Sequence, residues 1–253
     1  MNTMLNKVLP IDPLPSNIAE QLRSVDNFYV CTKFTEDMVG CPIVKIGKNV
    51  YYRFMNFIYL PQPPESLDIE QVKRICDLRL EYFDELVDRE LNKYVVTSIA
   101  DCVKAKIAYD APQMKGLDFG CGSGLSTELL LDCLPQMDLI GVDISEKAVS
   151  SSKEQGINAV LTIPGERLSF EAETFDIIFA VFVMHFNIDI ATLLDLRRTL
   201  RTSGLFIFNV YQRDIDGVTE QLEEAGFEAM EIWKRLHKIG DNHLIMSCRK
   251  HSE

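Results

Sequence analysis

The sequence lacks the features that would assign it to a membrane or to nucleic acid. No apolar run reaches the length of a membrane span, and the first residues lack the basic start and long apolar stretch of a secretion signal. The 253 residues include 26 lysines and arginines against 38 aspartates and glutamates, a formal net charge of −12. Nucleic-acid binding depends on basic side chains that neutralise phosphates, so the acidic balance disfavours a nucleic-acid partner. The lack of a long apolar run disfavours a membrane partner.

Cysteine is present, but without the spacing of a metal or dithiol site. The sequence contains no Cys-x-x-Cys pair, and its seven cysteines are scattered over positions 31, 41, 76, 102, 121, 133 and 248. An odd number without a disulfide framework is typical of a reducing compartment, so we expect a cytoplasmic protein with no bound metal. A hydrophobic content of 47% indicates an ordinary globular protein.

The most informative stretch is Leu117–Gly124, where an apolar residue and an acid precede glycines at three alternate positions. We expect a buried strand to end at Leu117–Phe119 and a helix to run over Leu125–Leu134. Glycine lets the chain turn sharply and lets a ligand approach the backbone. The helix start then directs free N–H groups and a positive dipole end toward that ligand. The pattern predicts a loop that binds a nucleotide-like cofactor.

Two familiar glycine loops are excluded. The dinucleotide pattern Gly-x-Gly-x-x-Gly would need glycine in place of Leu125 or Thr127, and the Gly-Lys-Ser/Thr ending of a phosphate loop is absent. The remaining pattern, acid-x-Gly-x-Gly-x-Gly, resembles motif I of the class I S-adenosylmethionine-dependent methyltransferases. The resemblance implies S-adenosylmethionine as methyl donor and S-adenosylhomocysteine as product. It also implies that the methionine part is held by Asp118 and by the backbone of Gly120, Cys121, Gly122 and Gly124.

A second acid follows at a suitable distance. The apolar run Met137–Val142 ends in Asp143, 25 residues after Asp118. A carboxylate at the tip of the second strand accepts hydrogen bonds from both ribose hydroxyls of an adenosine. The family uses its motif II acid this way, with the position of Ile144 packed on adenine. The alternative is that Asp143 only caps a helix over Ser145–Gln155.

The remaining strands are expected in the order that the family has, at Asn158–Ile163, Phe175–Ala180 and Leu205–Tyr211. Many members place an aspartate on the adenine amino group after the third strand. This sequence has Pro164 there, so we expect Gly165 and Glu166 to contact adenine instead. Ala180 and Val181, at the end of the fourth strand, complete the expected cofactor-binding set.

Strands that alternate with helices predict a parallel sheet covered on both faces. Leu193–Gly204 is expected to form a helix and turn, Gly217–Ala225 another helix, and Phe227–Leu236 with His243–Arg249 a terminal hairpin. The resemblance covers residues 112–250. It implies an α/β fold with a Rossmann-like, doubly wound, seven-stranded sheet whose last strand is antiparallel. We therefore assign residues 112–253 to an S-adenosylmethionine-binding domain.

Residues 1–111 carry no motif, and we interpret them as an α+β extension that caps the active site or mediates dimerisation. We expect strands at Phe28–Phe34 and Ile43–Leu60, then helical spacing over residues 69–109 with a break near Asp88–Asn92. Tyr51 and Tyr52 are substrate candidates, because aromatic faces hold planar or cationic acceptors. Core packing is the usual role of such a strand.

Methyl transfer is an in-line displacement that depends mainly on proximity and alignment. His185 follows the fourth strand, and its imidazole would remove a proton from an acceptor hydroxyl or amine, or else only orient the loop. Phe186 is a substrate candidate beside it. Weaker candidates near the strand ends are Asn187, Asp189 and Tyr211.

We therefore expect methyl transfer from S-adenosylmethionine to an oxygen or nitrogen nucleophile of a small molecule. A protein methyltransferase, a cofactor-binding but catalytically inactive partner subunit and an aminopropyltransferase are the alternatives. Methylation of nucleic-acid bases is disfavoured, because the Asn/Asp-Pro-Pro-Tyr/Phe tetrapeptide is absent and the chain is acidic.

Overall fold

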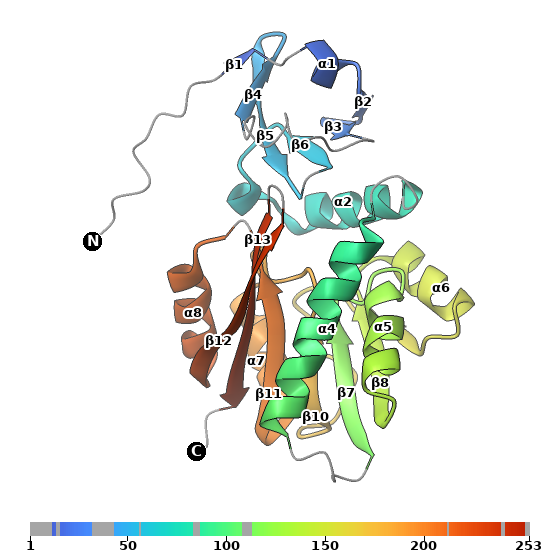
Figure 1. Ribbon diagram of the computed structural model, residues 1–253, viewed down its shortest axis with the longest axis vertical. Helices are drawn as coiled ribbons and strands as arrows, with labels where there is room; N and C mark the ends of the chain where they lie inside the picture. The colour runs from blue at the N-terminus through green and yellow to red at the C-terminus, as the bar shows by residue number, and fades with distance from the viewer. Residues whose placement is uncertain are drawn as a thin grey trace. The chain divides into compact units, whose positions relative to one another are not determined.

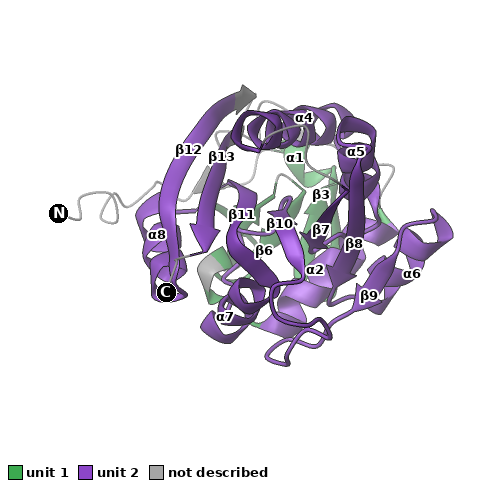
Figure 2. Cartoon of the chain, turned by 90° about the horizontal axis from the view of Figure 1, so that it is seen from below, with its two compact units in different colours: residues 1–68, 82–86 green, residues 69–81, 87–253 purple. Residues whose placement is uncertain are grey.

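A computed structural model describes residues 12–13, 16–31, 43–55, 57–82, 87–107, 113–211, 213–238 and 241–250. The chain divides into two compact units (Figure 2). Unit 1 contains residues 1–68 and 82–86, and unit 2 contains residues 69–81 and 87–253. The end of the predicted strand Phe28–Phe34 and the tip of the predicted terminal hairpin lie outside the described residues.

Unit 1 is built on a sheet of six described strands in the order β1-β4-β5-β6-β3-β2. Only β1 and β4 pair in parallel; the other neighbours are antiparallel. A turn at Gly47 divides the predicted strand Ile43–Leu60 and joins β4 to β5. The elements are β1 (Asp12–Pro13), α1 (Ser16–Ala19), β2 (Leu22–Val25), β3 (Phe28–Cys31), β4 (Ile43–Ile46), β5 (Asn49–Phe54), β6 (Ile58–Leu60) and the 3₁₀ turn η2 (Pro64–Ser66).

Unit 2 contains a seven-stranded sheet in the order β12-β13-β11-β10-β7-β8-β9. Five neighbouring strands of this sheet run parallel, in the order β11, β10, β7, β8 and β9. Strand β13 pairs antiparallel with β11 (Figure 1). This arrangement confirms the predicted α/β, Rossmann-like fold with its antiparallel last strand. The strands are β7 (Met114–Phe119), β8 (Met137–Asp143), β9 (Ala159–Leu161), β10 (Phe175–Ala180), β11 (Leu200–Val210), β12 (Phe227–Lys238) and β13 (Asp241–Lys250).

Short polar side chains begin most of the helices of unit 2. Backbone N–H groups are accepted by Asp88 at the start of α4, Ser145 at α6, Asp189 at α7 and Asp214 at α8. The predicted break in the 69–109 region is present, with the first helix ending at Glu81, earlier than expected. The helices are α2 (Ile69–Glu81), α4 (Arg89–Lys106), α5 (Leu125–Cys133), α6 (Glu146–Glu154), α7 (Ile190–Thr199) and α8 (Ile215–Glu224). None of the helices in the described residues is long and apolar enough to span a membrane.

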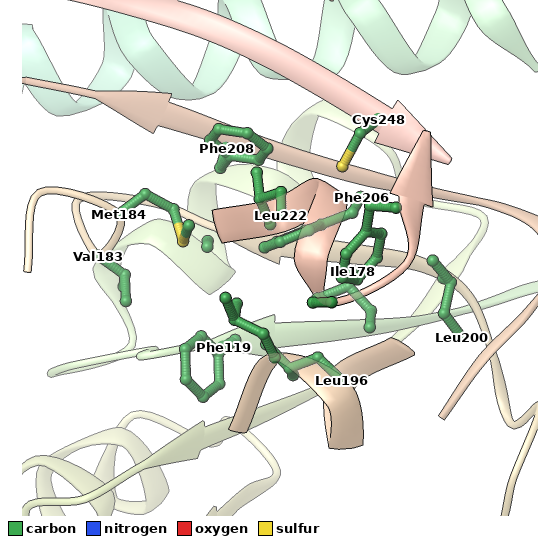
Figure 3. Packing of buried hydrophobic residues seen from close by; sticks show 14 of the residues in the cluster. Phe119, Ile178, Val183, Met184, Leu196, Leu200, Phe206, Phe208, Leu222 and Cys248 are labelled. Atoms are coloured by element: carbon green, nitrogen blue, oxygen red, sulfur yellow. The ribbon is translucent and has the colours of Figure 1, made fainter. Parts of the chain in front are cut away.

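Alternation along the central strands gives unit 2 a core on each face of its sheet. Ile178 and Phe206 pack with residues of α7 and α8, whereas Ile177 and Ile207 pack with residues of α4 and α5. Figure 1 shows α4 in front of the sheet and α7 behind it, and Figure 3 shows part of the α7/α8 side around Leu222. The two covered faces hold the strands firmly, so the loops at their ends are well positioned.

One strand begins earlier than expected. The turn predicted near Gly204 lies inside β11, which starts at Leu200 and shifts its register against β10. Ser203 adopts a positive φ of 65°, and a Cβ on Gly204 would meet Leu200 Cδ1 at 2.7 Å. The chain therefore continues as an irregular strand where a separate turn was predicted.

Candidate functional site

The candidate site lies at the carboxyl ends of β7, β8 and β10. Asp118 of β7 is in register with Gly141 of β8 and with Phe179 of β10. The loops that follow these three strands therefore leave the same edge of the sheet. The strand order reverses between β7 and β10, which is where ligands bind in open α/β sheets.

The glycine loop needs its glycines for two reasons. Gly120, Gly122 and Gly124 all have positive φ, at 76°, 56° and 93°. A Cβ on Gly120 would also lie 2.4 Å from Val183 Cγ2, so this glycine lets the loop approach the segment after β10. Cys121 is buried, and it occupies space that a side chain on Gly141 would fill. The predicted loop is thus packed tightly against both neighbouring strand ends.

Asp118 is fully buried and only half satisfied. Its Oδ2 accepts a 2.6 Å hydrogen bond from Thr127 Oγ1. Its Oδ1 is buried without a hydrogen-bond partner among the described residues. Burial raises the pKa of this carboxyl to about 7, against the opposing effect of the Thr127 hydrogen bond and with a smaller contribution from Asp143. The free oxygen of Asp118 is thus ready for a hydrogen-bond donor or a cation.

Asp143 connects the glycine loop to the next helix. Its Oδ2 accepts from Gly122 N at 2.9 Å and its Oδ1 from Ser145 N at 2.9 Å. The helix itself is capped by Ser145, whose Oγ accepts from Ala148 N at 3.1 Å, so Asp143 is not the N-cap. Burial raises the pKa of Asp143, and these backbone donors oppose that effect. Ile144, the expected adenine contact, is half-buried beside it.

The expected adenine segment forms an exposed turn. Glu166 N donates to Ile163 O at 3.0 Å, and Gly165 has a φ of 77°. Proline followed by glycine at the two central positions is typical of a type II turn, so Pro164 has a structural explanation here. Ala180 and Val181 are buried at the end of β10. The contact of Gly165 and Glu166 with adenine stays a prediction.

An aromatic cluster follows β10 and β11. His185 and Phe186 are buried with ring centroids 4.6 Å apart, and Tyr211 stacks on His243 at 4.6 Å. His185 also meets Tyr211 edge-on at 6.3 Å. Three of the predicted acceptor-side residues, His185, Phe186 and Tyr211, therefore lie together. Asn187 and Asp189 are exposed, and Asp189 accepts from Thr192 N as the cap of α7.

The electrostatics around His185 are unfavourable to its protonated form. Burial lowers the pKa of His185 to about 3, with further lowering by Arg79, His243 and Arg213. Arg213 is occupied in holding the loop, because it donates to Phe186 O at 2.6 Å and to Gln221 Oε1 at 3.0 Å. The imidazole is therefore neutral at physiological pH.

The two tyrosines of unit 1 differ in their surroundings. Tyr51 is buried in the core of that unit, where its ring meets Tyr29 edge-on at 4.9 Å. Tyr52 is half-buried in the same strand. Core packing, the usual role of an aromatic-rich strand, thus accounts for Tyr51. Contact of either residue with a substrate stays a prediction.

Sequence reasoning missed two residues beside the site. Phe182 adopts a positive φ of 59°, and its N–H donates to the buried Asn209 Oδ1 at 2.6 Å. The guanidinium carbon of Arg79, from α2, lies 5.7 Å from the centre of the Phe182 ring. Backbone strain at a non-glycine residue has no signature in the sequence. The position of Arg79 did have a signature in the sequence, because Arg79 stands four residues after Ile75 on the apolar stripe of its helix.

The residues present fit S-adenosylmethionine. The methionine part of this cofactor carries an ammonium group, which matches the unpartnered Oδ1 of Asp118. Its ribose offers two hydroxyl donors, which match a carboxylate such as Asp143 at the tip of the second strand. Within the described residues, no group of three or more His, Cys, Asp and Glu side chains could hold a metal ion.

Residues 117–208, from the strand before the glycine loop to β11, match the family model described as a methyltransferase domain. The match indicates a methyltransferase domain in this part of the chain. The match includes the glycine loop, Asp143 and His185. It excludes unit 1 and α2, so Arg79 lies outside the part of the chain that the family model describes.

The methyltransferase domain is also similar to individual proteins. The ribosomal protein L11 methyltransferase of Staphylococcus aureus strain JH1 is 29% identical over 133 residues, which are 50% of this chain and 42% of that protein. The chain thus spans less than half the length of these curated relatives. A possible histamine N-methyltransferase of Thermotoga maritima has a TM-score of 0.52 at 16% identity, covering 70% of this chain and 97% of that one.

Phosphoethanolamine N-methyltransferase 2 of Haemonchus contortus, solved with S-adenosyl-L-methionine, has a TM-score of 0.52 at 12% identity. The similarity covers 85% of this chain and 72% of that one. At such identities the solved structures support the fold of the methyltransferase domain and say nothing of its acceptor.

Proposed function

We propose that the protein transfers a methyl group from S-adenosylmethionine to an oxygen or nitrogen atom of a small molecule. The observation that carries the proposal is the buried Oδ1 of Asp118, an unused acceptor next to a glycine loop that Asp143 ties to α6. A buried carboxylate that is half satisfied destabilises a protein unless a ligand completes it. The match to a methyltransferase domain supports the methyl donor as that ligand.

S-adenosylmethionine supplies an activated methyl group on its sulfonium. Asp118 would hold the ammonium group, and Asp143 would accept from the ribose hydroxyls with the lone pairs that its two backbone donors leave free. Val183 and Gly120 bring the glycine loop against the segment that contains His185. The chain thereby aligns an acceptor with the donor, which is the main requirement of an in-line displacement.

His185 is better suited to orient an acceptor than to remove its proton. A general base is most effective when its pKa lies near the working pH, and burial lowers the pKa of His185 to about 3. We propose that the neutral ring directs the acceptor by packing and hydrogen bonding. The rings of His185, Phe186 and Tyr211 support a small, planar acceptor, because they form a compact apolar cluster.

A protein acceptor is the second candidate, because the curated relatives that match half of this chain are ribosomal-protein methyltransferases. The two candidates differ in the size of the labelled product. The purified protein is incubated with S-adenosylmethionine labelled in its methyl group and with a cell extract divided by ultrafiltration into small molecules and proteins. Label in the small-molecule fraction supports our proposal, and label only in the protein fraction supports the second candidate.

Binding and turnover are tested separately. If S-adenosylhomocysteine binds but neither fraction is labelled, the alternative of a catalytically inactive partner subunit is favoured. If neither S-adenosylmethionine nor S-adenosylhomocysteine binds, both methyl-transfer candidates fail.

A further inference from the structure

Helix α2 lies outside the residues that match the methyltransferase domain. Ser145 Oγ donates to Asp77 Oδ1 at 2.6 Å, and Lys147 Nζ lies 3.0 Å from Glu81 Oε1. These contacts hold α2 against the start of α6, directly after Asp143. One side of α2 is therefore fixed beside the cofactor-binding loop.

Arg79 stands where this helix would be expected to carry an apolar residue. Val72 and Ile75 are buried, and Arg79 follows them at spacings of seven and four, on the same stripe. A cation is expensive in such a position unless it is paired. Among the residues that the structure describes, no carboxylate lies within ion-pair distance of Arg79, whereas Arg74 on the same helix pairs with Glu81 at 3.0 Å. Burial lowers the pKa of Arg79, and the charge of Asp143 partly opposes that effect.

The guanidinium of Arg79 is held by an aromatic face. Its carbon lies 5.7 Å from the centre of the Phe182 ring, which is itself fixed by the hydrogen bond of Phe182 N to Asn209 Oδ1. A guanidinium that stacks through its face keeps its N–H edge available, and that edge matches a carboxylate in two parallel hydrogen bonds. Among the described residues, no acceptor takes a hydrogen bond from Arg79, so its N–H groups are left for a ligand.

The surroundings identify the charge of the ligand. Arg79 and His243 both disfavour a positive charge on His185, and no acid contributes at that ring. Asp118, the acid with a free oxygen, is at the end of β7, close to the segment that contains Phe182 through the contact of Gly120 with Val183. A positive and a negative group are thus presented at one edge of the sheet.

We propose that Arg79 binds a carboxylate of a ligand at this edge. The inference rests on the proposed function, and two sources of the carboxylate share this chemistry. One is the methionine part of the cofactor, whose ammonium Asp118 would hold. The other is the acceptor, in which case the substrate class is a small carboxylic acid.

Binding measurements separate the two sources. Isothermal titration compares the wild type with Arg79→Gln, which removes the charge, and with Arg74→Gln as the matched control on the same helix. The ligands are S-adenosylhomocysteine and its decarboxylated form, 5′-deoxy-5′-(3-aminopropylthio)adenosine, which keeps the ammonium group. In a second arm, benzoate and benzamide are titrated into protein saturated with S-adenosylhomocysteine. Circular dichroism verifies that each variant is folded.

If the cofactor supplies the carboxylate, Arg79→Gln weakens S-adenosylhomocysteine about 10- to 100-fold and leaves the decarboxylated form nearly unchanged. If the acceptor supplies it, S-adenosylhomocysteine binds equally and benzoate binding, stronger than that of benzamide, is lost in Arg79→Gln. Arg79→Lys recovers part of either effect, because it restores the charge without the planar fork.

The inference is overturned if the wild type binds S-adenosylhomocysteine and Arg79→Gln binds both S-adenosylhomocysteine and benzoate as the wild type does. If the wild type does not bind S-adenosylhomocysteine at all, the proposed function fails instead.

Discussion

A bound ligand would control whether the Asp118 carboxyl is ionised. Burial raises its pKa from 3.8 to about 7, so the folded protein retains this proton well above the pH at which an unfolded chain loses it. Ionised Asp118 is therefore a source of instability at neutral pH. An ammonium group at its free Oδ1 would stabilise the ionised form and complete its hydrogen bonding.

This ionisation predicts a pH dependence of cofactor binding. Binding of an ammonium group favours ionised Asp118, so the affinity for S-adenosylhomocysteine is greatest above the pKa of about 7 and falls as the pH falls below it. The affinity for S-adenosylhomocysteine falls by at most about tenfold for each unit by which the pH is lowered. Calorimetric titration between pH 5 and 8 measures this slope. Asp118→Asn should bind weakly with a flat profile, and the same slope in this variant would contradict the assignment.

Gly120 carries the strictest steric requirement in the glycine loop. Its φ is 76° and an added Cβ would lie 2.4 Å from Val183 Cγ2. We expect Gly120→Ala to lower the free energy of unfolding by about 2–4 kcal/mol, from the strained backbone and the overpacking together. Gly156→Ala is the control, because φ there is 80° and nothing lies within 4 Å of the added Cβ. The free energy of unfolding of each variant is measured by chemical denaturation. Equal losses in Gly120→Ala and Gly156→Ala would show that the contact with Val183 is unimportant.

At the scale of elements, the methyltransferase fold was largely predictable. Glycine spacing, the acid at Asp143 and alternating apolar runs mark β7, α5, β8 and β10 with the expected bounds to within a few residues. These signals are local, since each depends on the sequence of a single strand, turn or cap. The irregular start of β11 was missed, because Ser203 takes a positive φ that its residue type does not favour.

The acceptor side of the site was less predictable. His185 and Phe186 are on one loop, but their neighbours Tyr211 and His243 come from two later strands. Such a cluster depends on strand order, which the single sequence indicates only through the family resemblance. The apolar stripe of α2 marks the position of Arg79, but the placement of Arg79 at the site depends on the docking of α2 on α6, which no local pattern encodes.

The docking of α2 gives a prediction for its mobility. Removing the Asp77 carboxylate deletes the hydrogen bond from Ser145 Oγ and a 4.0 Å ion pair with Lys147. We expect Asp77→Ala to raise hydrogen exchange of α2 amides about fivefold, the effect of losing about 1 kcal/mol of local stability. Mass spectrometry of the exchanged peptides should show no change in α4, and Lys73→Ala should leave α2 unchanged. Equal exchange in wild type and Asp77→Ala would mean that α2 is held by other contacts.

At the scale of the whole molecule, the chemistry lies in unit 2, and unit 1 carries no recognised motif. The family match begins after α4 and ends before the terminal hairpin. The residues before residue 117, nearly half of the chain, therefore contribute nothing to the assignment. We propose that the extension over residues 1–111 caps the active site or mediates dimerisation. The choice of methyl acceptor is therefore the part of the function that the family match does not address.

The central claim is that the loop after β7 and the acid at the end of β8 form an S-adenosylmethionine site. The most direct test is calorimetric titration of the 253-residue protein with S-adenosylhomocysteine, in wild type, Asp143→Ala and Asp138→Ala. Asp138 is the matched control, an exposed acid on the same strand. We predict saturable binding in wild type and Asp138→Ala, and an affinity at least about tenfold lower in Asp143→Ala, because hydrogen bonds to a charged group are lost. Absence of binding to the wild type, or equal affinity of all three proteins, would contradict the account.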